Sequence, residues 1–297
     1  MNLLTGTQAL SAAQALGLER LDAQLLLLHA LGKPGSDRAW LLAHDTDLLP
    51  DEVAQHFRQL SLRRAGGEPL AYITGSKAFF GLDLQVDARV LVPRPDTETL
   101  VEWALQCLAE ADMPPSARVL DLGTGSGAVA LALKKSLPAL EVTAVDASVD
   151  ALAVARANAQ QHHLPVHFIH GNWFVNVSGH FHLIASNPPY VADADPHLSA
   201  LIHEPLQALA AGPDGLNDIR QIIEQAPAHL HPQGWLLLEH GYDQAQAVRG
   251  LLVQNGFTEV QSRADLSGIA RCSGGRWPGC GTDRGKRRDN APLISSF

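Results

Sequence analysis

Apolar residues recur at helical spacing through roughly the first 75 residues of the chain. The spacing predicts helices over 7–16, around Leu21 to Leu28, over 37–44, and from Pro50 to Gly66. No β-rich run interrupts them, so residues 1–75 are expected to form a small helical bundle. Residues 76–95 change to short alternating runs ended by prolines, which predicts a β-hairpin that links the bundle to the rest of the chain.

Strand and helix patterns alternate from Arg118 onward, within a domain expected to span 96–277. The expected strands are RVLDLG, EVTAVD, VHFIHG, HFHLIASN, WLLLEHG, FTEVQSR and a last one near Ile269. The expected helices cover 128–137, 149–162, 219–229 and 243–255, and a further one is capped by Asp96 and runs through Glu110. This alternation predicts an α/β fold with a doubly wound, mostly parallel sheet and helices on both faces. Ligands of such a sheet bind beyond the carboxyl ends of its strands.

The net charge separates the folded part of the chain from its end. Residues 278–297 hold three glycines, two prolines and a basic cluster without hydrophobic period, which predicts a disordered tail. The formal net charge is -9, and the tail has four basic and two acidic side chains, so residues 1–277 carry -11. That acidity weighs against a protein that covers nucleic acid with a broad basic face. No direct nucleic-acid binding is expected.

Cysteine and hydropathy patterns bear on the compartment. The three cysteines form no CxxC pair, which argues against a disulfide framework and fits a reducing compartment. The chain starts without a basic segment, and its longest strongly apolar run, Leu25 to Leu28, is far below the roughly 18 residues that span a bilayer. We therefore expect a cytoplasmic protein that has no membrane partner. A monomer is expected as well.

A glycine-rich loop follows the first strand of the α/β domain and opens a helix. The loop consists of Gly123, Thr124, Gly125, Ser126 and Gly127. Glycines permit positive φ and close approach to a ligand, and a helix start offers unpaired N–H groups. Asp146 ends the next strand, where a carboxylate can accept hydrogen bonds from both hydroxyls of a ribose. The loop alone fits either a nicotinamide dinucleotide or the adenosyl and methionine parts of S-adenosylmethionine.

The fourth strand ends in Asn187-Pro188-Pro189-Tyr190, which should face the same crevice as the glycine loop. The two prolines remove backbone donors, so nearby carbonyl groups are free to accept from a ligand. The Asn187 side-chain carbonyl and the Pro188 carbonyl can each accept one hydrogen of a planar NH₂ group, and Tyr190 can pack against its plane. Such contacts orient a weakly nucleophilic nitrogen toward an electrophilic methyl group without a metal. The simpler interpretation, a rigid turn with Asn187 as a cap, leaves the order of loop, acid and tetrapeptide unexplained.

These residues resemble the class I S-adenosylmethionine-dependent methyltransferases, and more closely the protein-(glutamine-N5) methyltransferases that modify peptide chain release factors. The resemblance covers about residues 5–277. It rests on EPLAYITG, AFFG, VLVPRPDTE, DLGTGSGAVALAL, AVD, NWF, SNPPY, EP, LLLEHG and GGRW. It implies a seven-stranded, Rossmann-like methyltransferase sheet and S-adenosylmethionine as cofactor.

The resemblance also assigns roles to residues. Gly123 to Gly127 would line the cofactor, Asp146 would hold its ribose, and Asn172 and Trp173 would bind its adenine. Asn187 would border the cofactor and, with Pro188, Pro189 and Tyr190, bind the target amide. Residues 1–75 would help to recognise the release factor, whose Gly-Gly-Gln loop would carry the target glutamine.

Two positions depart from the family pattern. Asn172 stands where the family usually has Asp, and Ile202-His203 replaces the usual Arg-Phe before Glu204-Pro205. The alternatives kept open are an adenine-N6 DNA methyltransferase, a nicotinamide-dependent oxidoreductase and a non-catalytic cofactor-binding module. The oxidoreductase leaves the NPPY segment unexplained, and the non-catalytic module would not need Asn187.

Several other polar residues have less specific interpretations. His162, His163, His167 and His170 are close in sequence but lack Cys or paired carboxylates, so no metal site is expected. Arg94, Asp96 and Glu98 either orient the substrate loop or cap the helix that follows. Glu239 ends a buried strand near the crevice, in a structural or a catalytic role.

Overall fold

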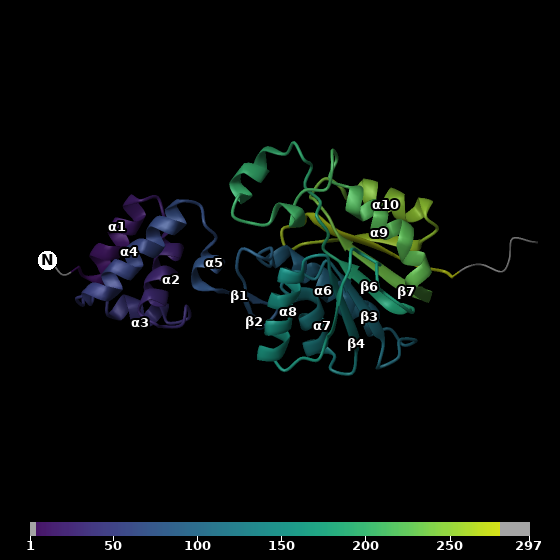
Figure 1. Cartoon of the computed structure of the whole chain (residues 1–297), viewed down its shortest axis with the longest axis horizontal. Coiled ribbons are helices and arrows are strands. Elements are labelled where there is room, and N and C mark those ends of the chain that lie inside the picture. Colours follow the sequence, from purple (N-terminus) through teal and green to yellow (C-terminus); the bar gives the residue numbers. More distant parts are fainter. Residues whose placement is uncertain (1–3, 280–297) are drawn as a thin grey trace, which may run out of the picture.

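The computed structural model describes residues 4–279, and Figure 1 shows a helical body at the N-terminal end of the chain beside a larger α/β body. The helices of the first body are α1 (Gly6–Ala15), α2 (Arg20–Ala30), α3 (Arg38–Ala43), α4 (Asp51–Ala65) and α5 (Leu70–Thr74). Its core includes the fully buried Leu26 to Leu28, together with Phe57 and Leu60 of α4. Leu21, near the start of α2, is 46% exposed, whereas Leu26 and Leu27 of the same helix are fully buried.

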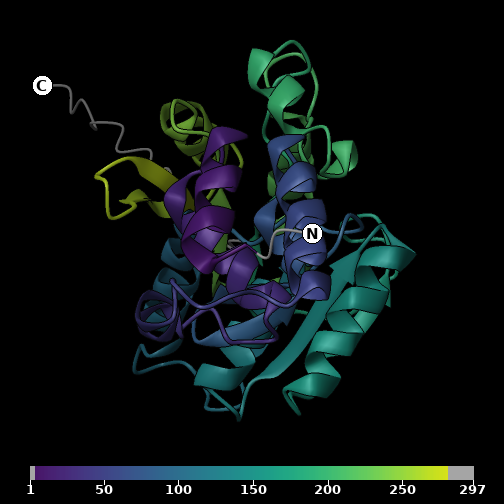
Figure 2. The same ribbon diagram turned by 90° about the vertical axis from the view of Figure 1, so that its left-hand side faces the viewer.

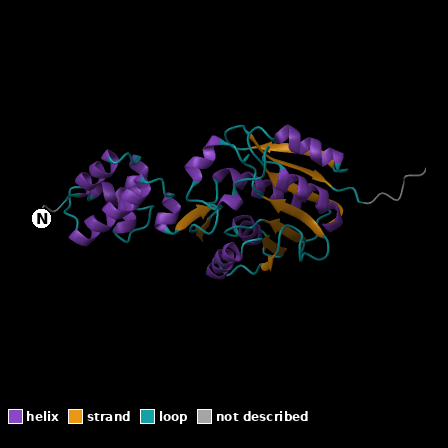
Figure 3. Cartoon of the chain, turned by 45° about the horizontal axis from the view of Figure 1, so that its top comes forward, coloured by secondary structure: helices purple, strands orange, loops and turns teal. Residues whose placement is uncertain are grey.

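A two-stranded antiparallel hairpin joins the two bodies, as the sequence predicts (Figure 3). Its strands are β1 (Ser76–Phe79) and β2 (Leu82–Gln85). The buried Asn158 side chain holds the hairpin to the α/β body, because it accepts from the Gln85 N–H at 2.7 Å and donates to the Gln85 carbonyl at 3.0 Å.

The α/β body contains a sheet with the strand order β5-β4-β3-β6-β7-β9-β8. The strands are β3 (Arg118–Leu122), β4 (Glu141–Asp146), β5 (His167–His170), β6 (Phe181–Ser186), β7 (Leu230–Glu239), β8 (Thr258–Ala264) and β9 (Ala270–Arg276). The first five strands of this order are parallel, and β9 runs antiparallel to both β7 and β8. The predicted mostly parallel, seven-stranded sheet is therefore confirmed for residues 4–279. The order reverses between β3 and β6, and a ligand crevice is expected at that point.

Helices cover both faces of the sheet. They are α6 (Glu98–Leu108), α7 (Ala128–Ser136), α8 (Val149–Gln161), α9 (Asn217–Gln225) and α10 (Ala245–Gln254), with the short 3₁₀ turns η1 (Pro95–Thr97), η2 (Pro196–Leu201), η3 (Leu206–Ala208) and η4 (Ala226–His229). One apolar cluster joins α6 and α7 to the sheet, and another joins α9 and α10 to its opposite face. Alternate residues of β3 enter the two clusters, with Val119 on one face and Leu120 on the other.

Three features differ from the sequence prediction or fall outside the structure. Asp96 does not cap α6: Thr97 occupies the cap position without a side-chain cap bond, and Asp96 pairs with Arg271 at 3.2 Å. Strand β7 begins at Leu230, five residues before the predicted WLLLEHG segment. Of the tail predicted to be disordered, residues 280–297 lie outside the described residues. None of the helices within residues 4–279 is long and apolar enough to cross a membrane.

Candidate active site

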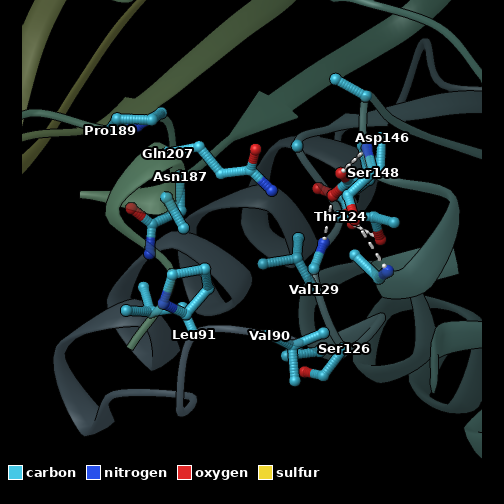
Figure 4. Close-up of a pocket in the computed structure, with 18 of the residues that line it drawn as sticks. Val90, Leu91, Thr124, Ser126, Val129, Asp146, Ser148, Asn187, Pro189 and Gln207 are labelled. Atoms are coloured by element: carbon cyan, nitrogen blue, oxygen red, sulfur yellow. Dashed lines mark hydrogen bonds between the residues drawn. The ribbon is translucent and has the colours of Figure 1, made fainter. Parts of the chain in front are cut away.

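A cavity lies at the carboxyl ends of β3, β4 and β6, where the strand order reverses (Figure 4). It brings together most of the site residues predicted from the sequence: Gly123, Thr124, Gly125, Ser126, Asp146, Asn172, Trp173, Asn187 and Pro189. Three predicted residues, Gly127, Pro188 and Tyr190, are not among those that line it. The cavity thus joins the glycine loop to the NPPY segment, although 60 residues separate them in sequence.

The glycine loop owes its shape to three positive φ angles, 70° at Gly123, 56° at Gly125 and 86° at Gly127. A Cβ atom at Gly123 would lie 3.3 Å from the Trp173 ring, and one at Gly127 would lie 3.1 Å from Leu131. A Cβ at Gly125 would meet nothing within 4 Å. Gly123 and Gly127 therefore serve packing, whereas Gly125 keeps the cavity open.

Asp121, the fourth residue of β3, holds the glycine loop in place through hydrogen bonds. It is 1% exposed, and its Oδ2 accepts from the Thr124 hydroxyl at 2.6 Å and from the Ala130 N–H at 3.1 Å. Burial raises the pKa of this carboxyl to about 6 in spite of those two hydrogen bonds. Asp121 thereby ties the loop to the first turn of α7.

The elevated pKa of Asp121 predicts a pH-dependent stability difference from the Asp121→Asn variant. The folded protein binds a proton at Asp121 more readily than the unfolded chain, whose reference pKa is 3.8. The stability that this proton uptake adds is fully present below the unfolded pKa and is lost as pH rises through about 6. From pH 5 to 7.5, the free energy of unfolding of the unmodified protein should fall by about 1–2 kcal/mol relative to the variant. Urea unfolding at both pH values measures this, and a difference independent of pH would contradict it.

Asp146 reaches across from the end of β4 to the same loop. Its two oxygens accept from the backbone N–H groups of Gly125 and Ser148, both at 2.8 Å. Burial raises the pKa of Asp146, and the backbone donors oppose that shift. Each oxygen retains a free lone pair toward the cavity, so the carboxylate can accept a pair of hydroxyl groups.

Trp173 forms one wall of the cavity and is 9% exposed. Its φ is 52°, a left-handed conformation, and its indole Nε1 donates to Asp218 Oδ1 at 3.2 Å. Asn172 lines the cavity beside it. The sequence reasoning missed Asp218 at the start of α9, and no local motif marks it. It also missed Gln207 of η3, whose amide extends into the cavity (Figure 4).

The NPPY segment follows β6 and contacts the linker before α6. Asn187 donates from Nδ2 to the buried Thr97 hydroxyl at 3.1 Å, which leaves Oδ1 as its free acceptor. The Tyr190 hydroxyl donates to Glu239 Oε1 at 3.4 Å, and burial raises the pKa of Tyr190. Pro188 is buried between them. Asn187 thus lines the cavity, and its Oδ1 accepts no hydrogen bond from other residues within 4–279, while the Tyr190 hydroxyl contacts Glu239.

The residues between the NPPY segment and α9 form a border of the cavity that is fixed by an ion pair. Arg94 Nη2 lies 2.5 Å from Glu204 Oε1, and Glu204 Oε2 accepts from the Val92 N–H at 3.2 Å. His203 Nε2 lies 3.2 Å from the Gly66 carbonyl at the end of α4. In Figure 2, viewed from the helical body, this green segment rises behind that body. The border of the cavity thus contacts the helical body directly, with Ile202 73% exposed.

Arg94, Asp96 and Glu98, predicted either to orient the substrate loop or to cap α6, each contact a different segment of the chain. Arg94 holds the border segment, and Asp96 pairs with Arg271. Glu98 accepts from the Phe80 N–H of the hairpin at 3.0 Å. None of the three acts as the side-chain cap of α6.

The sequence-adjacent histidines make local contacts. His162 Nε2 lies 2.8 Å from the Asp83 carbonyl, and His170 Nε2 lies 3.0 Å from the Ala147 carbonyl. Within residues 4–279, no three His, Cys, Asp or Glu side chains gather as metal ligands.

Both the helical body and the α/β body are similar to known proteins. Residues 3–75 match the family model "PrmC N-terminal domain", and residues 101–214 match "Methyltransferase small domain". The release factor glutamine methyltransferase of Bordetella pertussis is 48% identical over 87% of this chain and 95% of its own. That of Pseudomonas aeruginosa is 50% identical over 87% of this chain and 92% of its own. A methyltransferase structure from Pyrococcus furiosus, 22% identical, has the same fold, with a TM-score of 0.50 over 75% of this chain and 98% of that one.

Proposed function

The chain belongs to the family of release factor glutamine methyltransferases, and we propose that it transfers a methyl group from S-adenosylmethionine to a release factor glutamine. The acceptor atom is the N5 amide nitrogen of the glutamine in the Gly-Gly-Gln motif. One observation carries the proposal: Asn187, whose amide group is fixed by Thr97, shares a cavity with the glycine loop. A nicotinamide enzyme or a binding module has no use for that arrangement.

The cavity residues suit S-adenosylmethionine. Gly125 leaves space for a ligand, Asp146 offers two carboxylate oxygens, and Trp173 offers an aromatic wall. These groups match a glycine-backed chain, a ribose diol and an adenine ring, with Asn172 near the adenine. Thr124, Ser126 and Gly127 complete the loop that we assign to the cofactor. When bound, the cofactor supplies an electrophilic methyl group on a sulfonium ion.

The catalytic task of the chain is to orient the substrate amide. Its nitrogen is a poor nucleophile because its lone pair is delocalised into the carbonyl. We assign Asn187 Oδ1 and the Pro188 carbonyl as acceptors for the two N–H hydrogens, with Pro189 and Tyr190 completing the binding segment. Transfer of the methyl group from the sulfonium would place growing positive charge on the nitrogen that Asn187 and Pro188 hold. Both hydrogen bonds then strengthen, which favours the transition state over bound substrate. Release of one N–H proton to water would then give the neutral secondary amide.

The helical body is our candidate for recognising the rest of the release factor. Residues 1–75 adjoin the cavity border through Gly66 and His203, so a protein bound to both bodies would have a loop at the cavity. Ile202 and Leu206 are more than half exposed on that border and offer apolar contact to such a loop. We further propose that the enzyme works in the cytoplasm, as a monomer.

A labelling assay tests the proposed function. The purified protein is incubated with methyl-labelled S-adenosylmethionine and, in separate reactions, with a release factor, the same factor with its Gly-Gly-Gln glutamine replaced by alanine, and duplex DNA. We expect label only in the unmodified release factor. Label in DNA and none in the release factor would instead indicate an adenine methyltransferase.

A further inference from the structure

Glu239 is a buried carboxyl group directly behind the NPPY segment. It is the last residue of β7 and is 1% exposed. Its Oε1 accepts from the Tyr190 hydroxyl at 3.4 Å, and its Oε2 has no hydrogen-bond partner among residues 4–279. A buried carboxyl that lacks a full set of partners costs stability, so its presence beside a reaction site calls for an explanation.

Charged and polar groups from three segments face this carboxyl. Asp96 approaches from η1, Tyr190 from the NPPY segment, and Arg271 and Cys272 from β9. Burial raises the pKa of Glu239 to about 7, and Asp96 adds to the rise. The hydroxyls of Thr97 and Tyr190, as hydrogen-bonding neighbours, and the charge of Arg271 oppose it. Burial also raises the pKa of Cys272, which stays a neutral thiol.

Thr97 connects Glu239 to Asn187. Thr97 is 4% exposed, and its hydroxyl accepts from Asn187 Nδ2 at 3.1 Å. A hydroxyl has a single proton, and while its oxygen accepts from Asn187, that proton needs another acceptor. An ionised carboxylate is an acceptor only. Glu239, whose pKa the Thr97 hydroxyl lowers, has in Oε2 an acceptor that no other group occupies among residues 4–279.

We propose that ionised Glu239 is a positioning residue for methyl transfer, an inference that rests on the function proposed above. By accepting the protons of the Thr97 and Tyr190 hydroxyls, Glu239 fixes the direction of each hydrogen bond that follows. Thr97 can then only accept from Asn187, so Asn187 presents its carbonyl oxygen to the substrate amide. Once protonated, Glu239 donates in its turn. Thr97 is then free to donate to Asn187, whose amide can rotate and place its own N–H groups against those of the substrate.

The Glu239→Gln variant tests the inference, because it keeps the shape of the side chain and removes its ionisation. We expect kcat for release factor methylation to fall about tenfold or more, with KM and the cofactor Kd within about twofold. In the unmodified enzyme kcat should rise as pH passes through about 7, where Glu239 ionises, and the variant should lose this rise. Glu102→Gln, on the exposed face of α6, is the matched control and should behave as the unmodified enzyme.

Thr97 provides a second, independent test. Thr97→Val removes the acceptor for Asn187 at nearly constant volume and should lower kcat by a similar factor, whereas Thr97→Ser keeps the hydroxyl and should restore most of the rate. Circular dichroism melting verifies that each variant is folded. If Glu239→Gln does not fold, the comparison of Thr97→Val with Thr97→Ser tests the inference by itself.

Three results would overturn the inference: a Glu239→Gln enzyme with kcat within twofold of normal, a folded variant that retains the pH profile, or equal rates for Thr97→Val and Thr97→Ser. A different labelling result would show that the proposed function itself is wrong. In that case the unmodified enzyme itself would leave the release factor unlabelled, and the inference would fall with it.

Discussion

Replacing Asn187 with alanine should lower kcat for release factor methylation by about 100- to 1,000-fold. The variant loses the side-chain oxygen that we assign as acceptor for the substrate amide, and with it the alignment of the nitrogen toward the methyl group. Cofactor binding should change by less than about threefold, because the glycine loop and Asp146 keep their mutual hydrogen bond at 2.8 Å. Single-turnover methylation and calorimetric titration of the cofactor measure the two quantities separately.

Asn255→Ala is a suitable control for this experiment. Asn255 lies at the end of α10, where its side chain donates to the Leu251 carbonyl at 2.9 Å, and it does not line the cavity. Its loss should affect stability slightly and leave methylation intact. If Asn187→Ala retained a tenth or more of the rate, orientation by this amide could not be the main catalytic contribution.

Local sequence patterns were sufficient to predict the architecture around the site. The alternation of apolar strands and helices identified the α/β domain, and turn residues predicted a hairpin linker over 76–95, of which the two strands occupy only 76–85. The pattern misplaced the start of β7 because its first residues are interrupted. Gln233 has a φ of 69°, and the register of β6 against β7 shifts between Phe181 and Leu183. The five residues of β7 before Trp235, 230–234, therefore resemble a turn although they belong to the strand.

Contacts between distant segments were the part that the sequence could not supply. Asp96 is of a residue type that often caps helices. It instead forms an ion pair with Arg271, which lies 175 residues further along the chain. Thr97, Asp218 and Glu239 reach the site only because β6, β7, α9 and the linker converge there. No motif marks Asp218. Thr97 and Glu239 lie in the VLVPRPDTE and LLLEHG segments, but nothing local in the sequence shows which groups they contact.

The exposure of Leu21 has a related cause. Leu21, Leu25 and Leu28 share a helical face in sequence, but of these three only Leu28 is fully buried where α1 and α4 contact α2. Periodicity finds an apolar face and cannot say which part of it a neighbour will cover.

Gly125→Val should weaken cofactor binding strongly, raising the Kd for S-adenosylmethionine by about 100-fold or more. Gly125 lines the cavity with a φ of 56°, and a Cβ atom there meets no protein atom within 4 Å. The valine side chain would thus occupy the space that we assign to the cofactor. The left-handed backbone should also lower the free energy of unfolding by about 1–2 kcal/mol, since a β-branched residue is strained there. Calorimetric titration and urea unfolding measure the two effects.

Gly32→Val separates the two effects. Gly32 follows α2 in the helical body and has a φ of 65°, and a Cβ atom there would likewise meet nothing within 4 Å. The variant should show the same loss of stability as Gly125→Val and normal cofactor affinity. Normal affinity in both variants would mean that Gly125 does not border the bound cofactor. A weakened cofactor affinity in both would attribute the effect to lost stability, because only strain is common to the two positions.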